Sequence, residues 1–333
     1  MSSLNSSPSK VEVKKRLDTQ MNESVFQRSN VTIFWLNQLF QHLYSSFRPG
    51  FSKVLPKGYD PFDQPGVISK FKLNGIEYGN WLTQEDRYNY FLAAQIALFD
   101  LQGVLQFGYN LGLNKTVGIA FGARGKSAAK GHFEPDTFMI NITRYKEAKK
   151  LINPLTGMPV FGEKTTAEVK DILFEKTGGV GSLAHEYGHS IDYYFGTYID
   201  QDTKYRKYRG LTQGWSIADD PDTDYRKDSM RYDANMIINK LIWKNEKEYT
   251  KYYQVIRTAF DNGKLTDYWL RHCELFARSF ETYIHYKLNQ KGIKNTFLTH
   301  SKYEGSWAYP DKETLKAILP HFDSLITKMR KKL

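Results

Sequence analysis

Apolar side chains recur every three or four positions along much of the chain, the spacing that places them on one face of a helix. This pattern predicts helices at residues 31–47, 84–107, 166–174, 229–243, 248–260, 266–287 and 312–331. Three shorter stretches predict strands instead: residues 71–78, the continuous apolar run at 117–121, and residues 137–144, where apolar side chains alternate.

The first part of the chain differs from the rest in composition. Residues 1–29 are polar and rich in Ser and Lys, which predicts a flexible tail. Residues 30–70 combine a helical stretch with a loop interrupted by Pro and Gly, and they form a predicted helical extension. Residues 71–330 contain no internal repeat and no clear boundary, so we expect them to form one domain.

Composition narrows the class of protein. The chain has 333 residues, of which 41% are hydrophobic and 15% aromatic, enough apolar material for a core. The net charge of +11 permits weak contact with nucleic acid, although the basic residues are dispersed. Cys273 is the single cysteine, so no disulfide forms within the chain. Neither a signal peptide nor a long apolar window is present, and we therefore expect an intracellular protein without membrane contact.

The segment 185–189 reads HEYGH and lies in a predicted helix that Ser182 would cap and Gly196 would end. On a helix, positions i and i+4 lie about 40° apart and one turn along the axis. His185 and His189 can therefore point at one ion from the same face. Motifs of the form H-E-x-x-H on a helix are typical of zinc sites.

These residue types suggest distinct roles. His185 and His189 are candidate zinc ligands, and Glu186 is the candidate base that holds and deprotonates a metal-bound water. Asp192 shares their helix face, so it is either a further ligand or a carboxylate that orients an imidazole. Two ordinary histidines on an amphipathic helix are the alternative interpretation.

Such a site needs a third protein ligand. The position ten residues after His185 holds neither His nor Asp, so the donor must come from further along the chain. In residues 268–288, Glu274 and Glu281 lie seven positions apart on one side of an otherwise aromatic, predicted buried helix. Glu274 is the preferred ligand, and Glu281 is the runner-up or a group that orients a ligand. Both glutamates could instead pair with Arg271, Arg278 or Lys287.

Taken together, several motifs resemble the zincin-like metallopeptidase family called the first large polyvalent protein-associated domain, which occurs in phages and conjugative elements. They are EYGNW at 77–81, GIAFGARG at 118–125, HFEPDTFMINITR at 132–144, GVGSLAHEYGHSID at 179–192, ELFARSFETYI at 274–284 and AYP at 308–310. The resemblance covers about residues 71–325, and residues 145–177 look like an insertion where the family pattern is short.

The resemblance implies an α+β, zincin-like fold that is mostly helical, with a small mixed sheet whose edge strand lies above the H-E-x-x-H helix. It implies one Zn²⁺ ion held by His185, His189 and a downstream Glu, with Glu186 as the catalytic carboxylate. The implied activity is gluzincin-type hydrolysis of peptide bonds by a phage- or mobile-element-encoded enzyme. Its polypeptide substrate would come from the host or from the same element, in the bacterial cytoplasm or in a virion.

In this interpretation residues 137–144 form the edge strand, and an extended peptide pairs with it so that the scissile carbonyl faces the metal. The residues offering that backbone are Thr137, Phe138, Met139, Ile140, Asn141 and Ile142. Tyr283, Tyr309 and Arg278 are the candidate donors to the oxyanion.

Two other functions remain open. Residues 120–127 end in GKS after a predicted strand and resemble a relaxed phosphate-binding loop. Such a loop needs a long helix directly after it, whereas Gly131 and Pro135 follow closely here. The positive charge and the phage-type resemblance also allow a non-catalytic virion or DNA-associated protein on a zincin scaffold.

Overall fold

The computed structural model describes residues 63–80, 82, 84–124, 131–142, 181–200, 210–220, 225–293, 295, 297–299 and 306–333. The expected tail at 1–29 and the expected helices at 31–47 and 166–174 lie outside these residues. The chain divides into two compact units. Unit 1 comprises residues 1–103, 109–183 and 291–300, and unit 2 comprises residues 104–108, 184–290 and 301–333.

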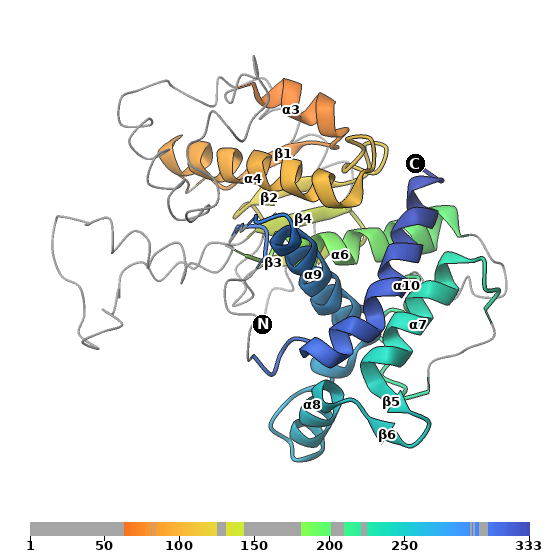
Figure 1. Ribbon diagram of the computed structural model, residues 1–333. Helices are drawn as coiled ribbons and strands as arrows, with labels where there is room; N and C mark the ends of the chain where they lie inside the picture. The colour runs from red at the N-terminus through yellow and green to blue at the C-terminus, as the bar shows by residue number, and fades with distance from the viewer. Residues whose placement is uncertain are drawn as a thin grey trace, which may run out of the picture. The chain divides into compact units, whose positions relative to one another are not determined.

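Unit 1 is built around a four-stranded mixed sheet with the order β1-β2-β4-β3 (Figure 1). Its strands are β1 (Ile76–Tyr78), β2 (Gly118–Phe121), β3 (Gly131–Glu134) and β4 (Met139–Ile142). Strand β2 pairs in parallel with both β1 and β4, whereas β3 pairs antiparallel with β4. The predicted strands at 71–78 and 117–121 thus correspond to β1 and β2, although β1 is shorter than expected.

Helices α3 (Gln64–Phe71) and α4 (Gln84–Leu105) complete unit 1. Helix α3 begins after Asp63, whose side chain accepts a hydrogen bond from the Gly66 amide, and it carries a proline in its first turn, where no amide partner is lost. Tyr90 of α4 stacks on Phe121 of β2 with ring centroids 5.3 Å apart. The apolar surface of α4 is therefore buried together with a strand of the sheet.

The sheet order corrects the expectation that residues 137–142 form an edge strand. Met139–Ile142 is hydrogen-bonded on both sides, by β2 and by β3. Thr137 and Phe138 lie in the turn that joins β3 to β4, where Phe138 has a positive φ of 52°. Because β3 folds back onto β4 through this turn, the backbone groups expected to pair with a peptide are already occupied.

Three of the motif stretches meet in a buried cluster of charges. Arg124 lies 2.9 Å from Glu77 and also forms an ion pair with Glu134. Each carboxylate lies on an outer strand of the sheet, β1 for Glu77 and β3 for Glu134. The Arg124 guanidinium thus connects the two outer strands, and removing one partner of such a group leaves an uncompensated buried charge.

Strand β3 also removes the structural basis for a phosphate-binding loop. Residues 125–130 lie outside the described part of the chain, and β3 begins at Gly131. The first described element after the GKS segment is therefore a strand, whereas a phosphate-binding loop requires a long helix whose N-terminus faces the phosphate.

Unit 2 is mostly helical. It contains α6 (Leu183–Tyr194), the π-helix η2 (Phe195–Ile199), α7 (Met230–Ile242), α8 (Lys251–Asp261), the 3₁₀-helix η4 (Asp267–Leu270), α9 (His272–Gln290) and α10 (Lys312–Arg330). The hairpin of β5 (Trp243–Asn245) and β6 (Glu248–Tyr249) joins α7 to α8. Helices α7 and α10 lie side by side, and α9 packs against both (Figure 1).

An aromatic cluster fills the space between α9 and α10. Phe322 of α10 lies 5.5 Å from Phe276, 6.0 Å from Phe280 and 5.0 Å from Tyr283 between ring centroids. All four side chains are buried. These contacts hold α9 against α10, and Phe280 also lies beside Tyr187 of α6, with ring centroids 6.4 Å apart.

The end of the motif helix differs from the expectation. Gly196 does not stop the helix, because the chain continues as the π-helix η2. The buried Arg231 donates hydrogen bonds to the carbonyl oxygens of Gly196 and Gly210. This guanidinium satisfies a carbonyl at the end of the motif helix that would otherwise need a C-cap.

The fold is therefore α+β and mostly helical with a small mixed sheet, as the sequence predicts. Within the described part of the chain, no helix is both long and apolar enough to span a bilayer.

Candidate metal centre

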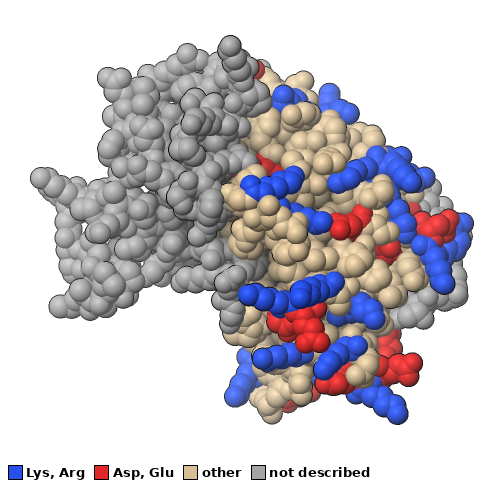
Figure 2. All heavy atoms as spheres, viewed as in Figure 1, with Lys and Arg blue, Asp and Glu red and all other residues tan. Residues whose placement is uncertain are grey.

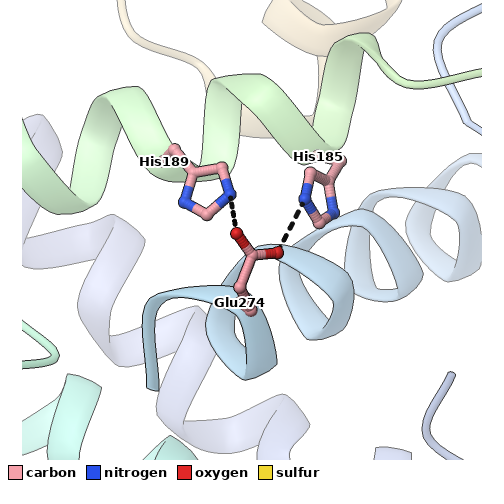
Figure 3. A group of neighbouring side chains, drawn as sticks. All are labelled: His185, His189 and Glu274. Carbon is pink, nitrogen blue, oxygen red and sulfur yellow. Dashed lines mark ion pairs between the residues drawn. The ribbon is translucent and has the colours of Figure 1, made fainter. Parts of the chain in front are cut away.

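Two helices of unit 2 supply the central side chains of the site. His185 and His189 project from α6 toward Glu274, which projects from α9 (Figure 3). A glycine lets the two helices approach closely, since a Cβ atom at Gly188 would lie 3.2 Å from the Ala277 Cα atom. The small residue within the HEYGH motif thus has a packing role, because the side chains at a contact set the distance between helix axes.

The three side chains form a compact set of donor atoms. Nε2 of His185 lies 3.3 Å from Oε2 of Glu274, and Nε2 of His189 lies 3.3 Å from Oε1 of the same carboxylate. One ligand atom from each residue can be chosen so that all lie within 4.8 Å of one another. Two ligands of a tetrahedral zinc ion, each about 2.0–2.1 Å from it, are about 3.3 Å apart. The spacing suits one small cation.

The surroundings of these atoms also fit a cation. Four carboxylates lie at the site or next to it and are at most 9% exposed: Glu186, Asp192, Glu274 and Glu281. Burying negative charge without compensation is unfavourable. Oε2 of Glu274 is buried and makes no hydrogen bond to any residue that the structure describes. A metal ion could bind this oxygen, and it would add positive charge to that of Arg278 and of protonated His189.

Burial affects the two imidazoles in different ways. It lowers the pKa of His185, and the neighbouring Glu274 offsets only part of this effect. Burial would also lower the pKa of His189, but the carboxylates of Glu274, Glu186 and Asp192 together raise it to about 9. His185 is thus held neutral, the form that ligates a metal, whereas His189 binds a proton that a metal would displace.

Glu281 faces the other nitrogen of the first imidazole. Its Oε2 atom lies 3.8 Å from Nδ1 of His185, on the opposite side of the ring from Glu274. Glu281 is not a member of the three-residue donor group. Of its two expected roles, the geometry favours orienting His185 over ligating a metal, since ligating histidines usually direct their second nitrogen to a carboxylate or carbonyl.

Asp192 serves the loop that follows α6. Its two carboxylate oxygens accept hydrogen bonds from the amide and the hydroxyl of Thr212. It lies outside the donor group, so the expectation that it ligates the metal is not supported. Its charge still acts on His189, because it contributes to the raised pKa of that imidazole.

Glu186 is 5% exposed and lies on α6 between the two histidines in sequence. Its negative charge contributes to the raised pKa values of His189 and Tyr268. The carboxylate is therefore electrostatically close to the donor group without belonging to it. A base that acts on a metal-bound water requires this kind of position.

The three expected oxyanion donors have different surroundings. Tyr283 donates a hydrogen bond of 2.7 Å to Asp323 on α10, so its hydroxyl is directed away from the donor group and the expectation for this residue is wrong. Tyr309 faces Glu281, which adds to the effect of burial in raising the tyrosine pKa. The Arg278 guanidinium lies 3.8 Å from Glu274 and donates to the Trp269 carbonyl and the Tyr252 hydroxyl.

Tyr268 was not expected from the sequence. The residue is 38% exposed, and the Arg278 guanidinium lies 5.9 Å from the centroid of its ring. Burial of its hydroxyl end raises the pKa of Tyr268, and the charges of Glu274 and Glu186 raise it further. A tyrosine beside both the third donor and the candidate base can offer a proton to a substrate. Its position in a 3₁₀-helix before α9 gave no local signal of this role.

The alternative ion pairs on α9 are mostly absent from the described residues. Arg271 pairs with Asp267 at 3.0 Å, and Lys287 pairs with Asp323 at 2.8 Å. Neither of these two cations pairs with Glu274 or Glu281, whereas the expected alternative pair of Arg278 with Glu274 is present at 3.8 Å. His272 is likewise occupied, since its two ring nitrogens contact the carbonyl oxygens of Thr212 and Ala218.

Charge on the surface is mixed rather than segregated. On the face shown in Figure 2, blue Lys and Arg side chains alternate with red Asp and Glu side chains. This view offers no continuous basic stripe of the kind that follows a nucleic-acid backbone.

Comparison with known proteins adds one finding. The family model of large polyvalent protein-associated domain 1 matches residues 260–333. Neither the curated proteins nor the solved structures contain a match to this chain. The matched segment includes Glu274 and Glu281, whereas the HEYGH helix precedes it. Residues 260–333 are thus similar to this family, and they include two of the motifs that suggest it, at 274–284 and 308–310.

Proposed function

We propose that this protein is a zinc-dependent endopeptidase. The observation that carries the proposal is the donor group of His185, His189 and Glu274, whose ligand atoms lie within 4.8 Å of one another beside the carboxylate of Glu186. Two imidazoles, one carboxylate and a position left open are the ligand set of catalytic zinc in hydrolases.

The donor types favour zinc over calcium or magnesium, which prefer oxygen ligands in larger number. A bound zinc ion would act as a Lewis acid and would lower the pKa of a coordinated water toward neutrality. Glu281 would hold the first ligand in place, because it faces Nδ1 of His185 while Nε2 faces Glu274.

Glu186 is assigned the proton transfer. Its carboxylate would take a proton from the attacking water and deliver it to the nitrogen of the leaving amine. Its burial supports this role, because a dry carboxylate interacts more strongly with a nearby proton donor. Tyr268 would donate a hydrogen bond from its hydroxyl to the carbonyl oxygen as negative charge develops there.

The family relationship suggests where the substrate comes from. Because the motifs resemble a family of phages and conjugative elements, the substrate is a polypeptide of the bacterial host or of the same mobile element. The proposal also covers the case in which the enzyme cleaves only one specific protein of the host or of the same element.

Metal analysis beside activity tests this proposal. Purified wild-type protein should contain about one zinc ion per chain, and His185→Ala and Glu274→Ala should lose it. Glu186→Gln should retain zinc, while cleavage of a proteome-derived peptide library, followed by mass spectrometry, falls by about a thousandfold or more. Glu313→Gln, an exposed change of the same chemistry on α10, is the matched control and should cleave normally. Zinc-free wild type, or full activity of Glu186→Gln, would disprove the proposal.

A non-catalytic DNA-associated protein on the same scaffold is the second candidate, motivated by the net charge of +11. It requires DNA binding that weakens steeply with salt and no peptide cleavage by zinc-loaded protein. The face shown in Figure 2 carries both signs of charge and gives no support for this candidate there.

A further inference from the structure

A groove of about 630 Å³ lies in unit 2 beside the candidate metal centre. Its walls come from the start of α8, the second half of α9, the start of α10 and the segment 306–311 that precedes α10. The volume is in the range of sites that bind a small molecule or a few amino-acid residues. None of the residues that line it is a member of the donor group.

The floor of the groove is apolar and partly open. Val255 is 43% exposed and Trp307 is 48% exposed, and Leu315 and Leu319 line the same space. Exposed apolar side chains that gather in one concave place usually mark a binding site. The groove is therefore suited to receive a bulky apolar side chain.

The rim of the groove is positively charged. Lys251, Lys312 and Lys316 line it, and none of them forms an ion pair with another residue in the described ranges. Lys251 and Lys312 are also the first residues of α8 and α10, so two helix N-termini open at the rim. The partial positive charge of a helix N-terminus adds to that of the lysines. One acidic residue, Asp311, lines the groove, and its carboxylate caps α10.

Two tyrosines connect this groove to the candidate metal centre. Tyr252 lines the groove, and its hydroxyl accepts a hydrogen bond of 3.3 Å from Arg278, which lies 3.8 Å from Glu274. Tyr309 also lines the groove and faces Glu281, the carboxylate opposite Nδ1 of His185. A peptide bound in the groove would therefore contact Tyr252 and Tyr309, and each of these tyrosines lies next to a residue that contacts the donor group.

We propose that this groove binds a segment of the polypeptide substrate in which bulky apolar side chains are flanked by acidic residues. The inference rests on the proposed peptidase function, and it specifies the substrate class. The apolar side chains would occupy the floor between Val255 and Leu315, and the acidic side chains would face the three lysines of the rim. A lysine-rich segment of the same size would be repelled.

Direct binding tests the inference without any need for cleavage. The probe is a fluorescein-labelled hexapeptide with phenylalanine and leucine at its centre and two acidic residues on each side. The comparison peptides carry four lysines in place of the acids, or two glycines in place of the central pair. Fluorescence anisotropy with zinc-loaded wild type should show that the acidic peptide binds at least tenfold more tightly than either comparison peptide at low salt.

Charge reversal on the rim is the decisive variant. In the double variant Lys251→Glu, Lys316→Glu, the ratio of the affinity for the acidic peptide to that for the lysine peptide should fall at least tenfold. Acidic residues near a helix N-terminus are favourable, so we expect the double variant to fold normally. The matched control is Lys247→Glu, Lys264→Glu, which changes the net charge equally at exposed positions outside the groove and should bind as wild type does. Val255→Gln should weaken binding several-fold through the apolar floor.

The outcomes separate the inference from the proposed function. Equal affinity for the three peptides, or an unchanged preference after charge reversal, would overturn the inference even if the protein cleaves peptides. The same binding preference in His185→Ala supports the groove as a peptide site independently of zinc. Zinc-loaded wild type could bind the acidic peptide and yet fail to cleave any longer peptide that contains its sequence. In that case the inferred binding stands and the peptidase function fails.

Discussion

At the scale of single residues, two histidines one turn apart have different protonation states. His185 is held neutral by burial, whereas three neighbouring carboxylates raise the pKa of His189 to about 9 despite its burial. The difference arises because Glu186 and Asp192 both lie close enough to His189 to act on it. The metal-free site is thus poised as an ion pair between His189 and Glu274, and a metal ion must replace the proton of that pair.

This competition predicts how zinc affinity depends on pH. Because His189 carries a proton up to about pH 9 in the metal-free site, each bound zinc releases about one proton. Affinity should therefore increase about tenfold per pH unit between pH 6 and 9 in competition with a chromophoric chelator. An affinity that does not change over this range would contradict the assignment of His189 as a ligand.

The stability of the metal-free protein should change in the opposite direction. A group whose pKa is raised on folding stabilises the folded state below its unfolded pKa, and this contribution is lost as the pH rises through the folded value. For His189 the window extends from about 6.5 to about 9. Urea unfolding of His189→Gln, compared with wild type without metal, isolates this contribution.

Tyr268 carries a third prediction at this scale. Replacement by phenylalanine removes the hydroxyl beside Glu274 and Glu186 and leaves the ring, so zinc content should not change. If the hydroxyl stabilises the oxyanion, kcat should fall by about a hundredfold with little change in KM. Tyr283→Phe is the control, since that hydroxyl bonds Asp323; it should retain kcat and lose about 1 kcal/mol of stability. Equal kcat in both variants would remove Tyr268 from the mechanism.

At the scale of helices and strands, the contact between α6 and α9 determines whether the site exists. The donors come from both helices, and Gly188 faces Ala277 and Phe280 at this contact, where an added Cβ atom would lie 3.2 Å from each. Because Gly188 lies between the two histidines on α6, a small increase in helix separation moves both imidazoles away from Glu274.

A larger residue at position 188 should weaken metal binding without removing a ligand. Gly188→Val places a branched side chain against Ala277 and Phe280, which should destabilise the protein by about 1–3 kcal/mol and lower zinc affinity at least tenfold. Gly103→Ala is the control, since no atom lies within 4 Å of its added Cβ in α4. That variant should gain up to about 1 kcal/mol through helix propensity and bind zinc normally. Normal zinc affinity in Gly188→Val would show that the contact tolerates adjustment.

Local patterns predicted some elements well and others poorly. The predictions for α4, α7 and α10 agree with the structure to within a few residues. Helices α7 and α10 are amphipathic and carry a periodic signal, whereas α4 is a long apolar stretch that is buried on nearly all sides. Helix α3 was not predicted, and its last residue, Phe71, was placed in a strand, although Asp63 and the proline after Gln64 are favourable at a helix start. The error on 137–142 has another cause: the short polar strand β3, which covers β4, has little signal of its own.

The residues of the site also divide into those with a local sequence signal and those without one. The spacing of His185 and His189 is a local feature of one helix, and Glu274 could be inferred because a carboxylate in an aromatic helix needs a partner. The positions of Tyr268 and Tyr309 near the carboxylates of the site depend on how η4 and the segment before α10 pack. No periodicity in the sequence encodes such packing.

At the scale of the whole molecule, the donor group belongs entirely to unit 2. His185, His189 and Glu274 all lie within residues 184–290, and the family match at 260–333 falls outside the sheet of unit 1. Ligands that bind only the folded state stabilise the part of the chain that holds them. Zinc should therefore act on the two units unequally.

Hydrogen exchange can measure this difference. At a zinc concentration about a hundredfold above Kd, the free energy of unfolding should rise by about 2.7 kcal/mol, and slow amides should exchange about a hundredfold more slowly. We expect this protection in α6 and α9 of unit 2, and no change in α4 and β2 of unit 1. His185→Ala should show no zinc effect in either unit. Equal slowing in α4 would mean that the units unfold as one cooperative body, and no slowing in α6 would mean that the donor group does not bind zinc.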